Sequence, residues 1–322
     1  MRKTLKIWVI IAASLILLGS TIFWGVMATL KWDFSKLSTA KYETNHYEIN
    51  EQFKAVSVNT NTADIVFIPS EKAACSVVCY EQKKMKHTVT IEKDTLVIEV
   101  VDTRKWYEYI GIDFRTSKIT IYLPKGEYGA LSIKSDTGDV EIPKDFQFES
   151  IDISESTGDV KNYASASGAL KIKTSTGNIR VENISASSLD LSVSTGKVTV
   201  LNVTCEGDVA VGVSTGKAYL TDITCKNVIS KGDTGDISLK NVIATEKFSI
   251  KRDTGDVKFD GCDAAEIFVK TSTGDIKGSF LTNKVFIIKS DTGSVKVPDS
   301  VTGGRCEIST DTGNIKLQII EN

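Results

Sequence analysis

The chain has 322 residues and a formal net charge of −2, from 39 basic and 41 acidic residues. Hydrophobic residues make up 41% and charged residues 25%, which are ordinary values for a globular protein. The near-neutral charge leaves no electrostatic footprint for a nucleic-acid-binding protein. Six cysteines are too few for a disulfide scaffold of this length, and two histidines, His46 and His87, leave little for histidine-based catalysis or a histidine-rich metal site.

The first predicted element is a transmembrane helix at residues 7–30, a stretch that carries no charged residue. A helix of this length spans about 36 Å, enough for a hydrocarbon core of about 30 Å. A cleavable signal peptide is the alternative, but its apolar core is about 7–15 residues long and ends at a small-residue cleavage site, which this run lacks. Residues 1–6 contain the basic residues Arg2, Lys3 and Lys6. The positive-inside rule therefore predicts a cytoplasmic N-terminus, a single-pass anchor and an extracytoplasmic remainder that starts with a linker at 31–50.

The rest of the chain is built from a repeat of 19 or 20 residues. A Thr-Gly pair recurs ten times, with its glycines at Gly138, Gly158, Gly177, Gly196, Gly216, Gly235, Gly255, Gly274, Gly293 and Gly313. Apolar residues alternate with polar ones on either side of each pair, as in Leu189-x-Leu191-x-Val193 and then Val198-x-Val200. This period of two indicates strands, and the phase flips at Thr-Gly, where glycine permits a tight corner.

The period predicts an all-β fold, a β-solenoid that resembles a β-helix. A unit of about 20 residues cannot bury its own apolar face, whereas stacked units share one continuous core. Ten coils about 4.8 Å apart make a rod of about 48 Å. The regular Thr-Gly solenoid is expected over residues 131–322, and residues 51–130 are expected to form degenerate coils, because Thr62-Ala63-Asp64-Ile65 resembles the repeat unit.

The degenerate region is also expected to contain a hairpin with residues 102–116 as its loop. That loop carries the aromatic residues Trp106, Tyr107, Tyr109 and Phe114. They are predicted to cap the open end of the solenoid, since an uncovered coil presents unpaired backbone groups, or else to form a contact surface. At the other end, residues 315–320 show no cap, so this end is expected to fray or to pair with another chain.

The cysteines are interpreted as core residues. Cys306 stands where the other coils have a large apolar residue, and Cys205 and Cys225 stand where neighbouring coils have alanine. A disulfide between Cys205 and Cys225, neighbours in the stack, is left open. No Cys-His group with the spacing of a metal site occurs, and we expect no cofactor.

Two ladders of polar residues remain as candidate sites. The first is an acidic corner in which closely spaced carboxylates are suited to Ca²⁺, a ligand of six to eight oxygens. The alternative is a solvated corner in which these side chains bond to turn amides. The weak metal candidates are Asp233, Asp236, Asp253, Asp256 and Asp275.

The second ladder is basic and suits an anionic polymer or lipid head groups outside the cell. Its alternative is a row of charges that offsets the acidic corner and discourages aggregation. The weak polymer-binding candidates are Lys258, Lys277, Lys296 and Lys316. A second row precedes the glycines at Lys231, Lys251, Lys270 and Lys289.

No catalytic residue is predicted. Enzymes with a parallel β-helix fold gather their carboxylates in one irregular cleft, whereas here the aspartates recur along the rod. A β-helix carbohydrate-active enzyme and a calcium-stiffened surface stalk are kept as alternatives to a non-enzymatic binding module.

The entry into the solenoid resembles a known family. The residues that carry the resemblance are Ile119–Pro124, Leu131–Ile133 and the unit Ser135–Val140. They are similar to the bacterial β-strand-repeat family named "putative adhesin", a domain of unknown function, and to the membrane-anchored envelope-stress proteins of Gram-positive bacteria that carry it. The resemblance covers about residues 50–320 and implies a surface-exposed solenoid in adhesion or envelope sensing, with cell-wall polymer or an envelope protein as partner.

Overall fold

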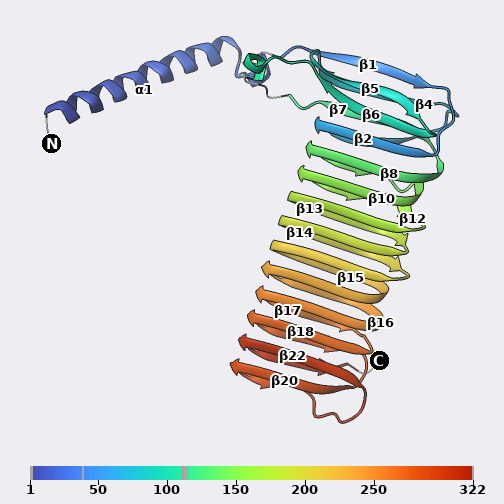
Figure 1. Ribbon diagram of the computed structural model, residues 1–322. Coiled ribbons are helices and arrows are strands. Elements are labelled where there is room, and N and C mark those ends of the chain that lie inside the picture. The colour runs from blue at the N-terminus through green and yellow to red at the C-terminus, as the bar shows by residue number, and fades with distance from the viewer. Residues whose placement is uncertain (1–2, 38–39, 110–112, 114, 321–322) are drawn as a thin grey trace.

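The computed structural model describes residues 3–37, 40–109, 113 and 115–320. It consists of an N-terminal helix α1 (Lys3–Thr29), a short 3₁₀ helix η1 (Phe34–Leu37) and 23 strands joined in one continuous sheet that coils into a rod (Figure 1). The rod confirms the predicted β-solenoid.

Each regular coil crosses the rod twice and turns at its Thr-Gly pair. We call the sheet that precedes the turns the pre-turn face and the sheet that follows them the post-turn face. The strands of the regular coils are β8 (Gly126–Thr137), β9 (Val140–Ile142), β10 (Phe146–Thr157), β11 (Val160–Asn162), β12 (Ser165–Ala166), β13 (Ala169–Ala186), β14 (Ser188–Cys205), β15 (Asp208–Thr234) and β16 (Ile237–Thr254). Adjacent coils pair in parallel with equal repeat positions opposite each other.

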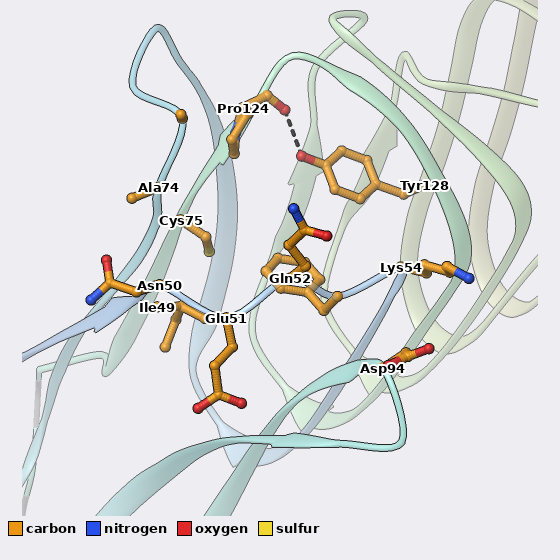
Figure 2. A pocket seen from close by; sticks show the side chains of 12 residues that line it. Ile49, Asn50, Glu51, Gln52, Lys54, Ala74, Cys75, Asp94, Pro124 and Tyr128 are labelled. Atoms are coloured by element: carbon orange, nitrogen blue, oxygen red, sulfur yellow. Dashed lines mark hydrogen bonds between the residues drawn. The ribbon is translucent and has the colours of Figure 1, made fainter.

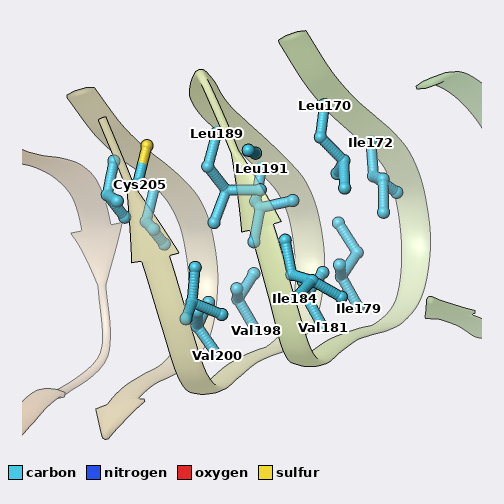
Figure 3. Packing of buried hydrophobic residues seen from close by; sticks show 14 of the residues in the cluster. Leu170, Ile172, Ile179, Val181, Ile184, Leu189, Leu191, Val198, Val200 and Cys205 are labelled. Atoms are coloured by element: carbon cyan, nitrogen blue, oxygen red, sulfur yellow. The ribbon is translucent and has the colours of Figure 1, made fainter. Parts of the chain in front are cut away.

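The core lies between the two faces. The alternating apolar residues of both faces point inward and stack coil upon coil, as Figure 3 shows for Leu189, Leu191 and Val198. Val198, Ile237 and Ile276 are at most 1% exposed. Because the same positions are apolar in every coil, one hydrophobic core runs along the rod.

The chain turns at two corners of each coil, and different residue types adopt positive φ at each of them. At the Thr-Gly corner the glycines have positive φ, and a Cβ at Gly196 would lie 1.8 Å from the carbonyl oxygen of Gly177. A further corner, which the sequence analysis missed, follows the post-turn strand and uses left-handed Asn or Asp. These residues are Asn183, Asn202, Asp222 and Asn241. The Asn202 side-chain amide donates to the oxygen of Asn183 at 2.8 Å, and Asn241 donates to Asp222 at 2.9 Å.

The degenerate N-terminal coil joins the same stack. β2 (Ala55–Thr62) and β3 (Asp64–Ser70) pair with β8 and β9, so that Thr62 lies opposite Thr137 and Ile65 opposite Val140. This register confirms the prediction that Thr62–Ile65 is equivalent to the repeat unit.

Five further strands cover this first coil; they are joined to one another by antiparallel pairs, and two of them stack on the coil in parallel. They are β1 (Tyr42–Ile49), β4 (Cys75–Gln82), β5 (Met85–Glu92), β6 (Thr95–Asp102) and β7 (Lys118–Pro124). β1 lies within the predicted linker 31–50, which is therefore shorter than expected, because Tyr47 and Ile49 alternate toward the core. The predicted hairpin around residues 102–116 is also wrong. β6 pairs with β2 and β5, and β7 pairs with β3 and β4, so this loop joins opposite faces of the rod.

The aromatic loop does not cap the rod. Trp106 and Tyr109 bound a short 3₁₀ helix η2 (Trp106–Tyr109) and are 77% and 58% exposed. Phe114 lies outside the described residues. The outermost strands at this end are β1 and β5, and the Tyr47 hydroxyl links them by donating to the His87 carbonyl at 2.8 Å.

The far end contains an exchange of order. The strands there are β17 (Val257–Cys262), β18 (Glu266–Thr273), β19 (Ile276–Phe280), β20 (Lys284–Thr292), β21 (Val295–Lys296), β22 (Gly304–Thr312) and β23 (Ile315–Ile319). β22 lies between β18 and β20 (Figure 1). On the other face, β23 lies between β19 and β21. The outermost coil is therefore β20–β21, and the expectation that residues 315–320 form the open end is wrong.

The helix α1 and the cysteines complete the fold. Residues Leu5–Thr29 have a mean hydropathy of 2.2. Within them, the most apolar stretch of 18 residues has no residue buried against the rest of the protein. This length and composition suit a membrane-spanning segment, a property that signal sequences share. All six cysteines are buried and free, so Cys205 and Cys225 are not bonded to each other.

Candidate binding surfaces

The structure brings the four candidate lysines together in one row on the post-turn face. Lys258 lies opposite Lys277, Lys277 opposite Lys316, and Lys316 opposite Lys296. All four are exposed, and neighbouring strands are about 4.8 Å apart. Within the described part of the chain, none of them forms an ion pair. We call these four residues the lysine row.

A second row runs along the pre-turn face on the other side of the Thr-Gly corner. Lys231, Lys251 and Lys270 are in register across β15, β16 and β18. Ser309 interrupts the row, and Lys289 beyond it pairs with Asp291 at 3.0 Å. The C-terminal half of the rod therefore carries positive charge on both sides of one edge.

The acidic corner lies between these rows and is occupied by backbone amides. The Asp236 carboxylate accepts the Asp256 amide at 3.1 Å, and Asp256 accepts the Asp275 amide at 2.8 Å. Lys217 also pairs with Asp236 at 3.0 Å, and this bond lowers the pKa of that carboxyl. Asp233 and Asp253 are exposed on the strand before the corner. The carboxylates of Asp236 and Asp256 thus stabilise the corner of the next coil, whereas Asp233 and Asp253 lie outside this ladder of bonds.

A cleft opens beside the N-terminal cap (Figure 2). Its volume is about 540 Å³, within the range of small-molecule sites. The rings of Phe53 and Tyr128 stack at 6.2 Å, and the Tyr128 hydroxyl donates to the Pro124 carbonyl at 2.7 Å. Burial raises the pKa of Tyr128 to about 12. The rim carries amides and charges of both signs, at Asn50, Glu51, Gln52, Lys54 and Asp94. This mixture favours no single class of ligand, and sequence analysis missed the cleft because its walls come from separate strands.

A buried polar group lies beneath the cap, and sequence analysis also missed it. The His87 ring donates or accepts at both nitrogens, 2.6 Å from the Glu81 carboxylate and 2.8 Å from the Thr60 hydroxyl. Glu81 also accepts the His87 backbone amide at 2.7 Å and the Asn45 side-chain amide at 2.7 Å. Thr60, Glu81 and His87 are each at most 3% exposed to solvent.

Cys79 joins this group to give the one set of potential metal ligands within the described residues, with ligand atoms within 4.8 Å of one another. Burial, and then the charge of Glu81, raises the pKa of the Cys79 thiol to about 12. The histidine nitrogens and the carboxylate are already engaged in hydrogen bonds. The arrangement is therefore that of a polar network that fixes the cap to the first coil.

Solved structures with a similar course of the chain include three from Parabacteroides and Bacteroides species. A "putative lipid binding protein" from Parabacteroides distasonis is 19% identical, with 75% of this chain and 95% of that chain covered and a TM-score of 0.46. A "putative adhesin" from Bacteroides fragilis is 18% identical, with 87% and 97% covered and a TM-score of 0.40. A "putative adhesin" from Parabacteroides merdae is 13% identical, with 87% and 97% covered and a TM-score of 0.46.

No curated protein matches the chain. A family model, by contrast, matches residues 53–212 and again residues 206–322, which together include every strand from β2 to β23. The resemblance drawn from the repeat residues agrees with this match, and the chain belongs to the Toastrack DUF4097 family.

Proposed function

We propose that this protein is a non-enzymatic binding and scaffold module of the cell envelope, anchored in the membrane by α1 with residues 1–6 in the cytoplasm and the solenoid outside. The apolar helix and the basic residues before it support the topology. The family and the adhesin-named relatives are in keeping with a surface domain.

The regular lattice supports a binding role over catalysis. An active site requires a few groups gathered at one place, whereas the polar ladders repeat from coil to coil. Fully buried polar residues such as Glu81 and His87 are enclosed in hydrogen bonds and offer no approach to a substrate.

The observation that carries the proposal is the lysine row. Four unpaired ammonium groups about 4.8 Å apart along a rigid rod match an extended polyanion, whose charges also repeat in a line. We propose an anionic cell-wall polymer as the ligand. An acidic envelope protein would present its charges on a less regular surface.

The test uses the full chain in proteoliposomes and purified anionic wall polymer. The quadruple variant with Lys258, Lys277, Lys296 and Lys316 changed to Glu is expected to lose binding at least about tenfold, with a weaker dependence of the residual binding on salt. The control changes four exposed lysines of the N-terminal coils, Lys134, Lys161, Lys171 and Lys173, to Glu, which alters the net charge equally. Equal losses in both variants, or no loss in the first, would exclude the lysine row as the site.

The topology has its own test. Protease added to intact protoplasts is expected to remove the solenoid while a tag placed before residue 3 stays protected. A tag that is digested, or a solenoid released into the medium without protease, would overturn the anchor and indicate a cleaved signal sequence.

A further inference from the structure

Three aromatic side chains of the loop between β6 and β7 are exposed at the end of the rod from which α1 departs (Figure 1). Trp106, Tyr107 and Tyr109 are each at least 50% exposed. The rings of Trp106 and Tyr107 meet edge to face, with their centroids 5.9 Å apart. Tryptophan and tyrosine concentrate at membrane–water interfaces, because their rings are apolar and their polar tips reach water.

The aromatic loop is held in one conformation by its own polar contacts. Glu108 forms an ion pair with Lys84 of the neighbouring β4–β5 turn. The Arg104 guanidinium donates from Nε to the Asp102 carboxylate at 2.9 Å and lies 4.4 Å from the centre of the Tyr109 ring. The Tyr109 hydroxyl donates to the same carboxylate at 3.0 Å. A loop fixed in this way presents its rings with little ordering cost on binding.

The same loop is bonded to the segment that arrives from α1. The Arg115 guanidinium donates to the Ala40 carbonyl and lies 4.2 Å from the centre of the Tyr42 ring. At the end of α1, Trp32 packs edge to face on Trp24, with their centroids 5.0 Å apart. The chain from Trp32 to Ala40 spans at most about 28 Å when fully extended. The aromatic loop is therefore tethered close to the point where α1 ends.

A basic cleft of about 490 Å³ opens beside the aromatic loop. Its lining includes Lys41, Lys83, Lys84 and Arg104, and its acidic lining residue is Glu108, which is paired with Lys84. Among the residues that the structure describes, Lys41 forms no ion pair, and that of Lys83 is long at 4.0 Å. Ammonium groups with this spare capacity are suited to a phosphate group.

We propose that this face of the cap lies on the outer surface of the membrane. The rings of Trp106 and Tyr107 then lie among the lipid head groups, and the basic cleft holds the phosphate of an anionic lipid. This inference rests on the proposed anchoring by α1, which keeps the cap beside the bilayer. Exposed rings next to unsatisfied lysines match the membrane surface, where apolar chains and anionic head groups meet.

Fluorescence quenching in nanodiscs tests the position of the aromatic loop. The full chain is placed in phosphatidylcholine with about 30% phosphatidylglycerol, and a fluorophore is attached to Tyr107→Cys. A nitroxide on the lipid head groups is expected to quench this label at least about twofold more strongly than the same label on Val301→Cys. Val301 is 88% exposed at the opposite end of the rod (Figure 1), and the native cysteines are buried. Equal quenching at both positions, in protein that stays in the disc, would overturn the proposal and indicate a protein partner for the loop.

Lipid charge and lysine variants test the cleft. In phosphatidylcholine alone, quenching of the Tyr107 label is expected to fall toward that of the control, because the cleft lacks its anionic ligand. Changing Lys41 and Lys83 together to Glu should cause the same fall in discs with phosphatidylglycerol. Lys171 and Lys173, two exposed lysines of the regular coils, are changed to Glu as the control of equal charge.

The outcomes separate this inference from the anchor on which it rests. Quenching that ignores both the lipid charge and the lysines would overturn the head-group site. Protein that separates from the discs during gel filtration would instead overturn anchoring by α1, and the inference with it.

Discussion

The guanidinium of Arg252 fills the space that Gly232 leaves in the adjacent coil. The two residues are opposite each other in the register of β15 and β16. A Cβ built on Gly232 would lie 1.6 Å from Arg252 Nη1 and 2.3 Å from the Val213 carbonyl oxygen. Arg252 is 1% exposed and donates from Nη2 to the Ser230 hydroxyl at 2.9 Å. Burial lowers the pKa of this guanidinium, yet a glycine-sized gap and two acceptors hold it inside.

Gly232→Ala is expected to destabilise the protein by about 2–4 kcal/mol, because the new methyl group overlaps both a buried side chain and a backbone carbonyl. Urea unfolding followed by circular dichroism measures the change. Gly212→Ala, on the same strand, is the matched control, since its Cβ would meet nothing closer than 3.5 Å. Its stability should stay within about 0.5 kcal/mol of the native value. Similar costs for both variants would show that the gap at Gly232 is not filled as described.

Ionisation of Glu155 should make the stability of the folded chain depend on pH. This residue is 4% exposed, and neither carboxylate oxygen has a hydrogen-bond partner among the described residues. Five other regular coils have a hydroxyl at this repeat position, and Thr271 and Thr310 donate theirs to the glycine carbonyl of the adjacent coil. An ionised Glu155 cannot donate in this way. Burial, and then the charges of the nearby aspartates, raises the pKa of Glu155 from 4.5 to about 8.

The folded state therefore holds this proton more tightly than the unfolded state. Between about pH 4.5 and pH 8 the folded chain binds more protons, so its stability falls as the pH rises and levels off above pH 8. Glu155→Gln should remove this loss and be more stable than the native chain by about 1–3 kcal/mol at pH 8. Unfolding temperatures of both proteins from pH 5 to pH 9 provide the measurement. Parallel curves for the two proteins would rule out a raised pKa at this site.

The repeat made most of the solenoid predictable. The spacing of Thr-Gly pairs fixed the coil length, and the apolar positions fixed which side chains face the core, as Val198 and Ile237 show. The exchange of the last two coils could not be read in this way. Every coil carries the same pattern, so the register of β22 is satisfied equally beside β18 or one level further out. The stretch from 297 to 303 allows the chain to step back.

The cap escaped prediction for a different reason. Its hairpins obey the same alternation as the solenoid strands, so the alternation alone does not reveal whether neighbours are parallel or antiparallel. The polar network of Thr60, Glu81 and His87 depends on three strands meeting beneath this cap. The available signal was a histidine and a glutamate at positions whose neighbours are inward and apolar, but a solvent-exposed strand face gives the same pattern.

The acidic corner yields a prediction about calcium. Asp256→Ala should cost about 1 kcal/mol, because the Asp275 amide loses its acceptor, whereas Asp256→Asn keeps an oxygen there and should be nearly neutral. Extracellular calcium-binding modules have dissociation constants of up to about 1 mM. Addition of Ca²⁺ at about 1 mM should nevertheless leave the unfolding temperature of the native chain unchanged. A calcium-dependent rise that both variants abolish would instead establish the calcium-stiffened stalk.

The polar network under the cap should contribute to the stability of the folded chain. His87→Leu removes one donor to the Glu81 carboxylate and leaves the Thr60 hydroxyl without its ring partner. A buried carboxylate deprived of a partner is costly, so we expect a loss of about 3–5 kcal/mol. The double variant with both Glu81 and His87 changed to Leu should lose less than the single one, because it buries no unpaired charge.

Cys79→Ala separates this network from a metal site. The thiol is protonated and stands beside the network, so its removal should cost about 1 kcal/mol through lost packing, and Zn²⁺ should not protect the native chain from thermal unfolding. If zinc were a ligand of Cys79, Glu81 and His87, it would raise the unfolding temperature of the native chain and not that of Cys79→Ala. A bound cation would also replace the hydrogen bond between Glu81 and His87. In the presence of zinc, the variant with both residues changed to Leu would then be less stable than Cys79→Ala and no more stable than His87→Leu.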